Sequence, residues 1–459
     1  MSQLVVIILA AGQGKRMNSD LPKVLHRVGG RTLLEHVVDA AHALKPKEVR
    51  VVYGHGGDQV PRALPNLDVI WIRQVEQLGT GHAVLQAMPG IPDPTTVLVL
   101  YGDVPLVSPL CLTQLLAHAS DTCLGLVTVR LADPSGYGRI LRDAQGAITG
   151  IVEQRDADQD QRTIDEVNTG ILAVEAGRLR HWLASLQLDN AQGEYYLTDV
   201  IVAAVRNGVT IRSVVASAVE EVLGVNDRIQ LAHLERHFQR TQAHQLMRSG
   251  VTLSDPARFD VRGTVRAGRD VLIDVNVILE GRIVLGQGVS IGPNVLIRDS
   301  EIGPSTHILA NCVIEKSRTG AHCQIGPFSR LRPGTHLSDG VHVGNFVEIK
   351  QSEVGAGSKV NHLTYVGDTE VGKRVNIGAG TITCNYDGAF KHRTVIGDDA
   401  FIGSGTELVA PVSVGAGSTI GAGSTITRDI PPGELAVARN RQVAIRGWKR
   451  PTKSTSNTS

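Results

Sequence analysis

The sequence is poor in aromatic residues, which make up 3% of its 459 positions, and its five cysteines include no CxxC pair. Cysteines scattered in this way argue against a disulfide framework or a zinc site and indicate reduced thiols in the cytoplasm. Lysine and arginine (46) balance aspartate and glutamate (45). The resulting formal charge of +1 argues against a general binder of nucleic acid or of anionic membranes.

Long apolar runs are also missing. No stretch approaches the roughly 20 residues that a membrane span needs. The apolar run Leu4–Ala11 follows Met1 without a basic leader or a signal cleavage pattern. We therefore expect a cytoplasmic protein without membrane or nucleic-acid partners, and its length suffices for two or three domains.

Glycine, by contrast, is frequent, with 50 residues, and apolar residues recur at every sixth position in the second half of the chain. The leads of these hexads are Val265, Val271, Val277, Ile283, Val289 and Val295, then Ile325, Leu331, Leu337, Val343 and Ile349, and later Ile396, Ile402, Leu408, Val414, Ile420 and Ile426. A helix repeats near 3.6 residues and a strand at 2, so a period of six fits neither. It indicates a hexapeptide array of short strands wound into a parallel β-helix, from about 251 to 427.

The first half of the chain alternates strand-like and helix-like patterns. The expected strands are Val5–Leu9, Val49–Tyr53, Asp68–Trp71, Val97–Leu100 and Leu124–Val129, and the expected helices are Leu33–Leu44, Gly81–Met88 and Leu110–Ala119. This alternation predicts a Rossmann-like, doubly wound α/β domain whose ligands bind at the carboxyl ends of the strands. One helix, capped by Asp227 and ended by Gly250, is expected to link it to the hexads.

A glycine-rich loop, AAGQGKRM, directly follows the first expected strand. Its glycines allow successive backbone N–H groups to point at a phosphate, and Arg16 and Lys23 supply cations beside it. Gln74 and Gly79 belong to a second polar turn at a strand end. The loop matches neither the P-loop nor the GxGxxG pattern, so an ordinary strand-to-helix turn is the alternative.

Asp103 follows the expected strand Val97–Leu100 in the segment YGDVP. A carboxylate at the carboxyl end of a strand can hold Mg²⁺ beside a bound nucleotide. The alternative is a turn aspartate, the common role of Asp in a loop before Val-Pro.

The spacing of the hexads predicts which outward residues stack. Each coil takes three hexads, and the hexad after Ile349 is one residue short, so Leu331, Ile349 and Val366 are expected above one another. Arg332 and Lys350 each follow one of these leads and therefore stack. Two cations one strand spacing apart, about 4.8 Å, repel each other, and a sugar phosphate between them would account for the pair.

Glu348 and Tyr365 each precede one of these leads, so they are expected along the same edge. His362 lies at an outward position on the adjoining wall, beside the cations and an aromatic hydroxyl. Its imidazole suits general-base catalysis near neutral pH. The alternative is a solvated surface on which Glu348 is merely the counter-ion of Arg332 and Lys350. Residues 384–395 break the hexads and predict a protruding loop, a common place for function.

Several motifs together resemble those of sugar-1-phosphate nucleotidyltransferases. They are LAAGQGKRM with LPK, Gln74, GTGHA, YGDVPL, the segment GYGR at 136–139, Glu153, NTG at 168–170 and GVND at 224–227. With the hexads, nearly the whole chain resembles the family of bifunctional N-acetylglucosamine-1-phosphate uridyltransferase/glucosamine-1-phosphate N-acetyltransferases. The resemblance implies a uridyltransferase domain at 1–226, a linker helix at 227–250 and a left-handed β-helix acetyltransferase domain with a C-terminal tail at 251–459.

The resemblance also implies two reactions. Acetyl-CoA acetylates glucosamine-1-phosphate, and UTP then converts N-acetylglucosamine-1-phosphate to UDP-N-acetylglucosamine with release of pyrophosphate. The implied cofactor is Mg²⁺ and the implied assembly is a homotrimer with acyl sites between subunits. The product would feed peptidoglycan and lipopolysaccharide precursors.

The family motifs imply the following site residues. The nucleotide would contact Leu9, Ala10, Ala11, Gly12, Lys23, Gln74, Gly79, Thr80, Tyr101, Gly102 and Asp103, and the sugar would contact Gly138, Glu153, Asn168 and Asn226. Asp103 and Asn226 would carry Mg²⁺, while Arg16 and Lys23 would neutralise the triphosphate in catalysis. Glucosamine-1-phosphate would be bound by Arg332, Glu348, Lys350, Tyr365 and Asn376, with His362 as the catalytic base. Acetyl-CoA would lie along Ala379, Asn385, Tyr386, Ser404, Ala422 and Arg439.

Two other functions are compatible with a hexapeptide array. The β-helix could be only an oligomerising or regulatory module of a nucleotidyltransferase, or it could be a scaffold for a partner protein. A scaffold predicts an exposed apolar patch and no cluster of charges. Consumption of acetyl-CoA with glucosamine-1-phosphate, measured without UTP, separates the bifunctional enzyme from both.

Overall fold

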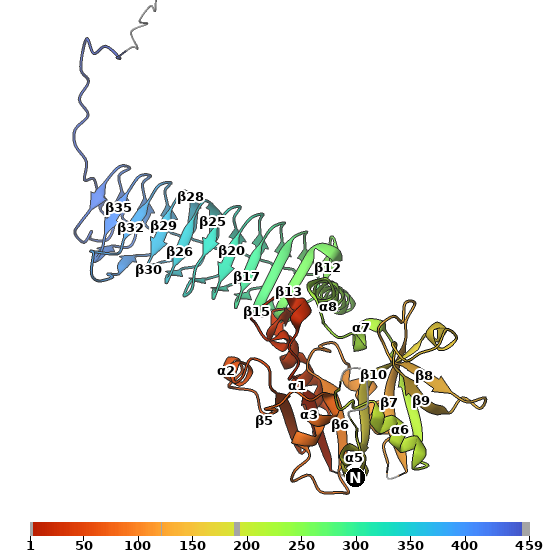
Figure 1. Cartoon of the computed structure of the whole chain (residues 1–459). Helices are drawn as coiled ribbons and strands as arrows, with labels where there is room; N and C mark the ends of the chain where they lie inside the picture. Colours follow the sequence, from red (N-terminus) through yellow and green to blue (C-terminus); the bar gives the residue numbers. More distant parts are fainter. Residues whose placement is uncertain (1–2, 121, 188–192, 452–459) are drawn as a thin grey trace, which may run out of the picture. The chain divides into compact units, whose positions relative to one another are not determined.

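The computed structural model describes residues 3–120, 122–187 and 193–451 (Figure 1). The chain divides into two compact units, Met1–Gln242 and Ala243–Ser459. Among the described residues, no helix is long and apolar enough to cross a membrane.

A nine-stranded sheet forms the centre of the first unit. Its strands are β1 (Leu4–Leu9), β4 (Glu48–Tyr53), β5 (Ile70–Arg73), β6 (Thr96–Tyr101), β7 (Cys123–Arg130), β8 (Arg139–Arg142), β9 (Ile148–Val152), β10 (Glu166–Glu175) and β11 (Thr210–Val215). The order is β11-β7-β10-β6-β1-β4-β5, with β8 beside β10 and β9 beside β8. The five expected strands are all present, and β5 begins two residues later than expected.

Helices cover both faces of this sheet. They are α1 (Leu33–Ala43), α2 (Gln59–Ala63), α3 (Thr80–Ala87), α4 (Pro109–Leu116), α5 (Ala176–Ala184), α6 (Asp199–Arg206) and α7 (Val219–Val222), with the 3-10 turns η1 (Lys15–Met17), η2 (Lys23–Leu25) and η3 (Gln161–Thr163) and the short hairpin β2 (Arg27–Val28) and β3 (Arg31–Thr32). Alternate residues of β1 enter different cores: Ile7 packs with Val84 of α3, and Ile8 packs with Val37 of α1. Burial on both faces explains the continuous apolar run of β1 and confirms the predicted doubly wound class.

The antiparallel part of the sheet was not predicted. Strand β10 runs antiparallel to β6, β7 and β8, and β8 pairs antiparallel with β9. The register of β10 against β7 shifts between Asn168 and Leu172, and Gly170 has a φ of 82°. Such a bulge turns side chains out of the regular alternation, and it lies within the segment Asn168–Gly170 that the family motif singles out.

Helix α8 (Arg228–Arg248) occupies the region where a linker helix was expected. The Asp227 carboxylate accepts a hydrogen bond from Gln230 N at 2.8 Å, and Gly250 has a φ of 98° beyond the end of the helix. The side-chain oxygen of Gln230 accepts from Asn226 N at 2.7 Å, so the first turn of α8 holds the backbone of Asn226 in place. The functional domain boundaries remain a prediction.

The second unit is a parallel β-helix built from two sheets. The eleven-stranded sheet consists of β12 (Thr252–Leu253), β14 (Leu272–Ile273), β16 (Ser290–Ile291), β19 (His307–Ile308), β22 (Gln324–Ile325), β25 (His342–Asn345), β28 (Lys359–His362), β31 (Asn376–Ile377), β34 (Phe401–Ile402), β37 (Thr419–Ile420) and β39 (Leu435–Ala436). The seventeen-stranded sheet consists of β13 (Phe259–Ala267), β15 (Val277–Leu285), β17 (Leu296–Arg298), β18 (Glu301–Ile302), β20 (Val313–Glu315), β21 (Arg318–Thr319), β23 (Arg330–Leu331), β24 (His336–Leu337), β26 (Glu348–Lys350), β27 (Glu353–Val354), β29 (Tyr365–Gly367), β30 (Thr369–Val371), β32 (Ile382–Cys384), β33 (Thr394–Ile396), β35 (Glu407–Val409), β36 (Val412–Val414) and β38 (Thr425–Ile426). The turn η4 (Pro256–Arg258) precedes β13.

The larger sheet contains two of the three walls of the β-helix. From β17 onward its strands form two alternating ladders, one through β20, β23, β26 and β29 and the other through β21, β24, β27 and β30. Leu331 pairs with Ile349, and Ile349 pairs with Val366, so successive coils are offset by 18 and then 17 residues as predicted. This agreement confirms the stacking that the short hexad implied.

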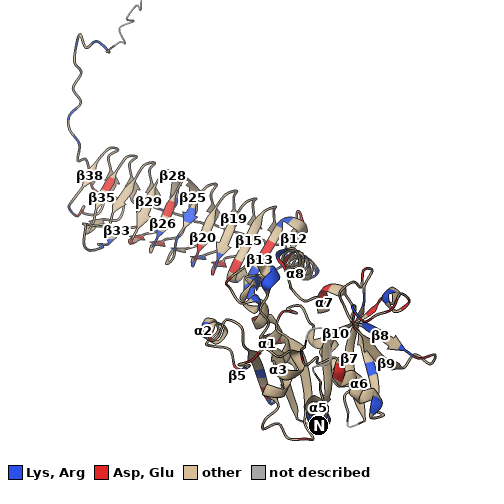
Figure 2. Ribbon diagram, viewed as in Figure 1, with Lys and Arg blue, Asp and Glu red and all other residues tan. Residues whose placement is uncertain are grey.

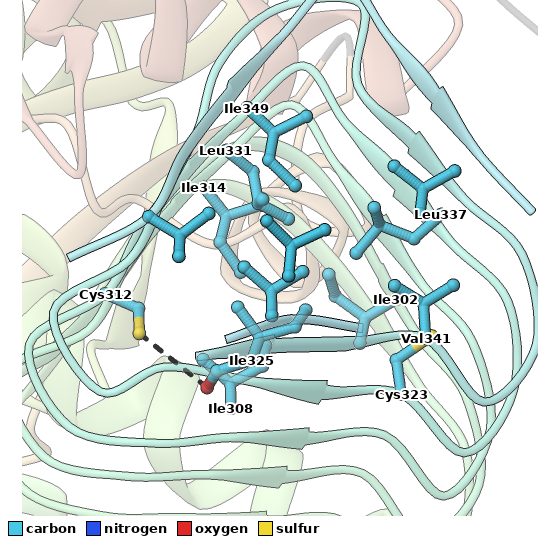
Figure 3. Packing of buried hydrophobic residues seen from close by; sticks show 14 of the residues in the cluster. Ile302, Ile308, Cys312, Ile314, Cys323, Ile325, Leu331, Leu337, Val341 and Ile349 are labelled. Atoms are coloured by element: carbon cyan, nitrogen blue, oxygen red, sulfur yellow. Dashed lines mark hydrogen bonds between the residues drawn. The ribbon is translucent and has the colours of Figure 1, made fainter. Parts of the chain in front are cut away.

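The leads of the hexads fill the interior of the β-helix. In Figure 3 Ile314, Leu331 and Ile349 point into the coil from one wall, and Ile308 and Ile325 from another. The thiol of Cys312 lies in the same core, 3.8 Å from the carbonyl oxygen of Ile325. All five cysteines of the chain are free thiols, and four of them are buried.

Candidate functional site

The first candidate site is a cavity of about 530 Å³ at the carboxyl ends of β1, β5 and β6, the edge where α/β sheets bind ligands. Its lining consists of Leu9, Ala10, Ala11, Gly12, Gln13, Lys15, Lys23, Val24, Gln74, Gln77, Gly79, Thr80, Ala83, Tyr101, Asp103 and Glu194. Of the predicted nucleotide-binding residues, all but Gly102 line it. The structure thus brings together residues that are far apart in the sequence.

Gly102 supports the wall of this cavity from behind. Its N–H donates to the carbonyl oxygen of Leu9 at 2.9 Å. A β-carbon at this position would lie 3.2 Å from Val24 and 3.3 Å from the side chain of Ala10. Glycine therefore lets the loop after β1 and the turn η2 approach β6 closely.

Lys23 joins the two predicted metal ligands. Its ammonium forms an ion pair with Asp103 and donates to the Asn226 side-chain oxygen at 3.2 Å. A carboxylate and an amide oxygen that reach one ammonium lie close enough to bind one metal ion, and such hard oxygen donors suit Mg²⁺. No cluster of three or more His, Cys, Asp or Glu that could hold a metal occurs in residues 3–120, 122–187 and 193–451. Mg²⁺ at this place would complete its shell with water and phosphate oxygens, as it commonly does.

A smaller hollow of about 150 Å³ adjoins the cavity and shares Tyr101 and Asp103 with it. The other residues that line it are Val104, Val129, Leu131, Tyr137, Asn168, Thr169, Val219, Val222, Leu223, Gly224 and Asn226. Asn168 and Asn226, both predicted to hold the sugar, therefore face one hollow. Gly138 and Glu153 lie beside each other, because a β-carbon at Gly138 would come within 3.2 Å of the Glu153 carboxylate.

The part of the site that is predicted to bind the sugar is only partly open to water. Burial raises the pKa of the Tyr101 phenol well above its usual range, and the Asp103 and Glu153 carboxylates act in the same direction. Burial also raises the pKa of Glu153, and it raises the pKa of Tyr137, to which Asp103 adds. Both phenols therefore stay protonated near neutral pH and can donate hydrogen bonds.

Arg16 lies apart from these residues. It is exposed in η1 and lines neither cavity, whereas its neighbour Lys15 lines the larger one. Its charge still lowers the pKa of Tyr137 against the effect of burial. The catalytic role of Arg16 remains a prediction. Lys15 and Gln13 were missed, although they belong to the same glycine-rich loop.

The second candidate site lies on the β-helix, where charged residues recur along the strands (Figure 2). One column begins with the pairs Arg262–Glu280, Glu280–Arg298 and Arg298–Glu315 on successive coils. Two ion pairs tie it together: Arg298 lies 3.1 Å from Glu280 and 2.8 Å from Glu315. Alternating charges on adjacent strands stabilise such a ladder.

This alternation breaks where the sequence predicted stacked cations. The pairing of Ile314 with Leu331, and of Leu331 with Ile349, places Arg332 after Glu315 and Lys350 after Arg332. The next position in the column is Gly367, which has no side chain. The two cations are thus followed, on the next coil, by a position that has no side chain of its own.

A tyrosine hydroxyl occupies the space above this glycine. A β-carbon on Gly367 would lie 2.3 Å from the Tyr365 hydroxyl, which therefore reaches the position beside Lys350. Arg332 donates to Glu348 at 2.8 Å, and this carboxylate raises the pKa of Arg332. Arg332, Lys350, Glu348 and Tyr365 thus line one edge, as predicted.

Lys391, from the loop that breaks the hexads, adds a third cation. Its side chain lowers the pKa of Lys350, and partial burial and Arg332 act in the same direction. The only sequence signal for Lys391 was the irregular loop in which it lies. The path of this loop, and so the position of the Lys391 side chain, could not be predicted from the sequence. In the same loop Asn385 donates to Asp368 and lies 3.5 Å from the Tyr365 hydroxyl, while Tyr386 is 61% exposed.

His362 stands at the corner next to this edge. Its Nδ1 lies 2.9 Å from the side-chain oxygen of Asn345, with which it is paired on the neighbouring coil. An amide oxygen only accepts, so Nδ1 carries the proton and Nε2 keeps a free lone pair.

The predicted acetyl-CoA residues continue from the corner of His362. Gly380 N donates to the His362 carbonyl oxygen at 3.3 Å, and on the next coils Gly405 N donates to Ala379 and Gly423 N to Ser404, at 2.7 and 2.8 Å. Arg439 donates to the carbonyl oxygen of Ala422 at 2.5 Å. Ala379, Ser404 and Ala422 therefore form one column along the β-helix.

Asn376 is separate from the cationic edge. It pairs with Lys359 and Phe401 in the eleven-stranded sheet, whereas Arg332, Lys350 and Tyr365 belong to the other sheet. A single chain therefore does not place Asn376 on the wall that carries these three residues. Its contact with the acetyl acceptor remains a prediction.

Comparisons with known proteins agree with both units. Residues 6–165 match the MobA-like NTP transferase domain, and residues 393–428 match the bacterial transferase hexapeptide (six repeats). The relative named Bifunctional protein GlmU from Methylococcus capsulatus is 59% identical, over 98% of both chains. Those from Alkalilimnicola ehrlichii (58%; 98% of this chain, 96% of the relative) and Marinobacter nauticus (56%; 99% and 100%) bear the same name.

Fold and sites together define a bifunctional transferase, in which a nucleotidyltransferase unit precedes a hexapeptide acyltransferase unit. The chain belongs to the family of bifunctional GlmU proteins. This membership confirms the predicted enzyme of UDP-N-acetylglucosamine synthesis, with uridyltransferase and acetyltransferase domains, and the predicted α/β plus β-helix fold.

Proposed function

We propose that the cavity beside Lys23 transfers the uridylyl group of UTP to N-acetylglucosamine-1-phosphate, and that the edge beside Lys350 presents glucosamine-1-phosphate for acetylation by acetyl-CoA. The break in the charge column at Arg332 and Lys350 is the observation that carries the second assignment. The first rests on the contacts of Lys23 with Asp103 and Asn226.

In uridylyl transfer, an oxygen of the sugar phosphate attacks the α-phosphorus of UTP, and the bond to the β-phosphate breaks as pyrophosphate leaves. Such a reaction needs in-line positioning and neutralisation of negative charge more than a covalent catalyst. Lys23 supplies a cation inside the cavity, and the loop after β1 supplies backbone N–H groups. Asp103 and Asn226 would hold Mg²⁺, which when bound supplies further positive charge beside the phosphates.

The smaller hollow would bind the sugar. Asn168 and Asn226 offer amide groups for its hydroxyl and acetamido substituents, and the protonated Tyr101 and Tyr137 phenols offer donors. Glu153, whose pKa burial raises, lies beside Gly138; neither residue is among those that line the hollow, and their contact with the sugar remains a prediction.

The cationic edge would bind the phosphate of the acetyl acceptor. Arg332 and Lys350 occupy adjacent positions where the rest of the column alternates in sign. Glu348 pairs with Arg332 at 2.8 Å and Asp368 acts on Lys350, but no acidic residue lies between the two cations in the column itself. A phosphate beside the Tyr365 hydroxyl would accept hydrogen bonds from this hydroxyl and from both cations. Lys391 would add a further contact from the loop.

His362 would act as the general base. Its free Nε2 can take a proton from the acceptor ammonium, and the resulting amine attacks the thioester carbonyl of acetyl-CoA. The carbon–sulfur bond then breaks and coenzyme A leaves as the thiolate, which takes one of the two protons on the attacking nitrogen, so that the neutral amide and the free thiol are formed. Asn345 holds Nδ1–H in hydrogen-bonding position, which fixes the tautomer that this step requires.

A homotrimer would complete the acyl site. Phe328, Phe346 and Leu363 lie at one corner on successive coils, and they are 51%, 55% and 63% exposed. The two phenylalanine rings stack with centroids 5.4 Å apart, next to the corner that carries His362. Burial of this apolar ridge against other copies would bring their residues, including Asn376, to the site. We place the enzyme in the cytoplasm, where free thiols persist.

Replacing Lys350 with glutamate should weaken the binding of glucosamine-1-phosphate while leaving the stability of the fold nearly unchanged. The substitution restores alternating charge after Arg332, so the midpoint of thermal unfolding should fall by no more than about 3 °C. It also removes a cation and adds repulsion to phosphate. Since a hydrogen bond to a charged group contributes about 1.5–3 kcal/mol, kcat/KM for glucosamine-1-phosphate should fall about 100-fold or more.

Arg262→Ala is the matched control, because it removes a cation from the same column at coils remote from Lys350. Acetyl transfer by this variant, and uridylyl transfer by both variants, should stay at the wild-type rate. Wild-type kcat/KM for glucosamine-1-phosphate in Lys350→Glu would refute the proposed phosphate site.

A further inference from the structure

Gln74, which directly follows β5, lines the nucleotide cavity but is only 2% exposed. Its side-chain nitrogen lies 3.2 Å from the carbonyl oxygen of Gly79 and 3.0 Å from Nδ1 of His82. A carbonyl oxygen can only accept, so the amide must turn its NH₂ group, and not its oxygen, towards Gly79. The orientation of the Gln74 amide is therefore fixed by its surroundings.

His82, in the first turn of α3, uses the second hydrogen of this NH₂ group. Its Nδ1 must then be the unprotonated, accepting nitrogen, and the neutral imidazole carries its proton on Nε2. Gln86 lies one helical turn further on, with its side-chain nitrogen 3.1 Å from Nε2. Since an NH₂ group cannot accept the Nε2 proton, the Gln86 amide must be turned over, with its oxygen at this place, to complete a chain from Gln86 through His82 to Gln74.

With both amide hydrogens engaged, Gln74 offers the cavity only an acceptor, its oxygen Oε1. This oxygen has no hydrogen-bond partner in the described part of the chain. Uracil carries a hydrogen on N3, whereas cytosine carries a lone pair there. An acceptor fixed at this place attracts the first base and repels the second.

We propose that His82 is a positioning residue that holds the Gln74 amide as an acceptor and thereby selects uracil over cytosine nucleotides. This inference rests on the proposed uridylyl transfer. Without the Nδ1 acceptor, only the hydrogen bond to Gly79 would hold the amide, so a rotation that presents NH₂ to the lone pair of cytosine would cost one hydrogen bond instead of two. His82 thus acts on base selection through Gln74 rather than by touching the nucleotide.

The test is a competition between equal concentrations of UTP and CTP for N-acetylglucosamine-1-phosphate, with the UDP-sugar and CDP-sugar quantified by mass spectrometry. His82→Leu removes the acceptor and should lower the ratio of UDP-sugar to CDP-sugar at least about tenfold. His82→Asn places an amide oxygen near the position of Nδ1 and should keep the ratio within about threefold of wild type. His82→Met serves as a second apolar variant should the leucine variant not fold.

Because a product ratio does not depend on the amount of active enzyme, the summed yield of UDP-sugar and CDP-sugar serves only to show that the first unit of each variant is folded and active. An unchanged product ratio in the apolar variants would overturn the role of His82, and so would an equal fall in the asparagine variant. If wild-type enzyme forms no UDP-sugar at all, the proposed uridylyl transfer itself is wrong. The two failures are therefore distinguishable.

Discussion

Asp103→Asn should lower Mg²⁺-dependent release of pyrophosphate from UTP by about 1000-fold or more and leave acetyl transfer unchanged. The substitution keeps the shape of the side chain but removes the charge that pairs with Lys23. It also removes the one carboxylate among the two proposed metal ligands. Loss of a single group that stabilises developing charge typically costs a factor of 100–1000, and here two such interactions fail together.

The measurement is steady-state pyrophosphate release across a Mg²⁺ titration. Asp39→Asn is the matched control, because Asp39 is an exposed aspartate of the same unit that pairs with Arg31. This control should behave as wild type. Uridylyl transfer at the wild-type rate in Asp103→Asn would instead favour the turn-aspartate interpretation and remove the metal assignment.

His362→Ala should lower kcat for acetyl transfer by about 100- to 10,000-fold, the usual contribution of a general base, with little change in the KM of either substrate. In the proposed mechanism the imidazole would contribute by taking a proton, whereas Arg332 and Lys350 would hold the phosphate. Uridylyl transfer by the same variant should be normal, because its site lies in the other unit.

Release of coenzyme A, followed with a thiol reagent, measures this effect. His307→Ala is a suitable control, since His307 occupies a strand position in the same sheet as His362 and bonds to Ser290. A His362→Ala enzyme that retained normal kcat would require another base.

The cationic edge could be predicted because, in a β-helix, the spacing of residues in the sequence directly determines which of them lie on adjacent coils. One missing residue between Ile349 and Val354 sets the offset of the next coil, and this offset alone places Tyr365 beside Glu348. The charge column was not visible in advance. Glu315 becomes the neighbour of Arg332, and Arg298 the neighbour of Glu315, only when the coils before Arg332 are aligned as well.

Irregular segments could not be predicted in the same way. Lys391 reaches Lys350 from a loop whose path depends on its own contacts, among them the bond of His392 to Asp387. Asn385 was assigned from a motif, but its bond to Asp368 follows from a corner that the hexads do not specify.

In the first unit, local pattern identified the parallel strands and not the antiparallel ones. The apolar run of β1 is buried on both faces and is distinctive, whereas β8 and β9 have a mixed burial pattern and form a hairpin at the periphery of the sheet. The contact between Lys23 and Asn226 joins residues 203 positions apart. Only the family motifs, and not the pattern, connected these two residues to one site.

Release of coenzyme A from acetyl-CoA and glucosamine-1-phosphate, in the absence of UTP, tests most directly whether one chain carries two independent transfer sites. We expect one thiol to appear for each acceptor consumed, at a rate that added UTP does not change. No thiol release from a preparation that forms UDP-N-acetylglucosamine from UTP and N-acetylglucosamine-1-phosphate would contradict the account and leave the β-helix a structural module.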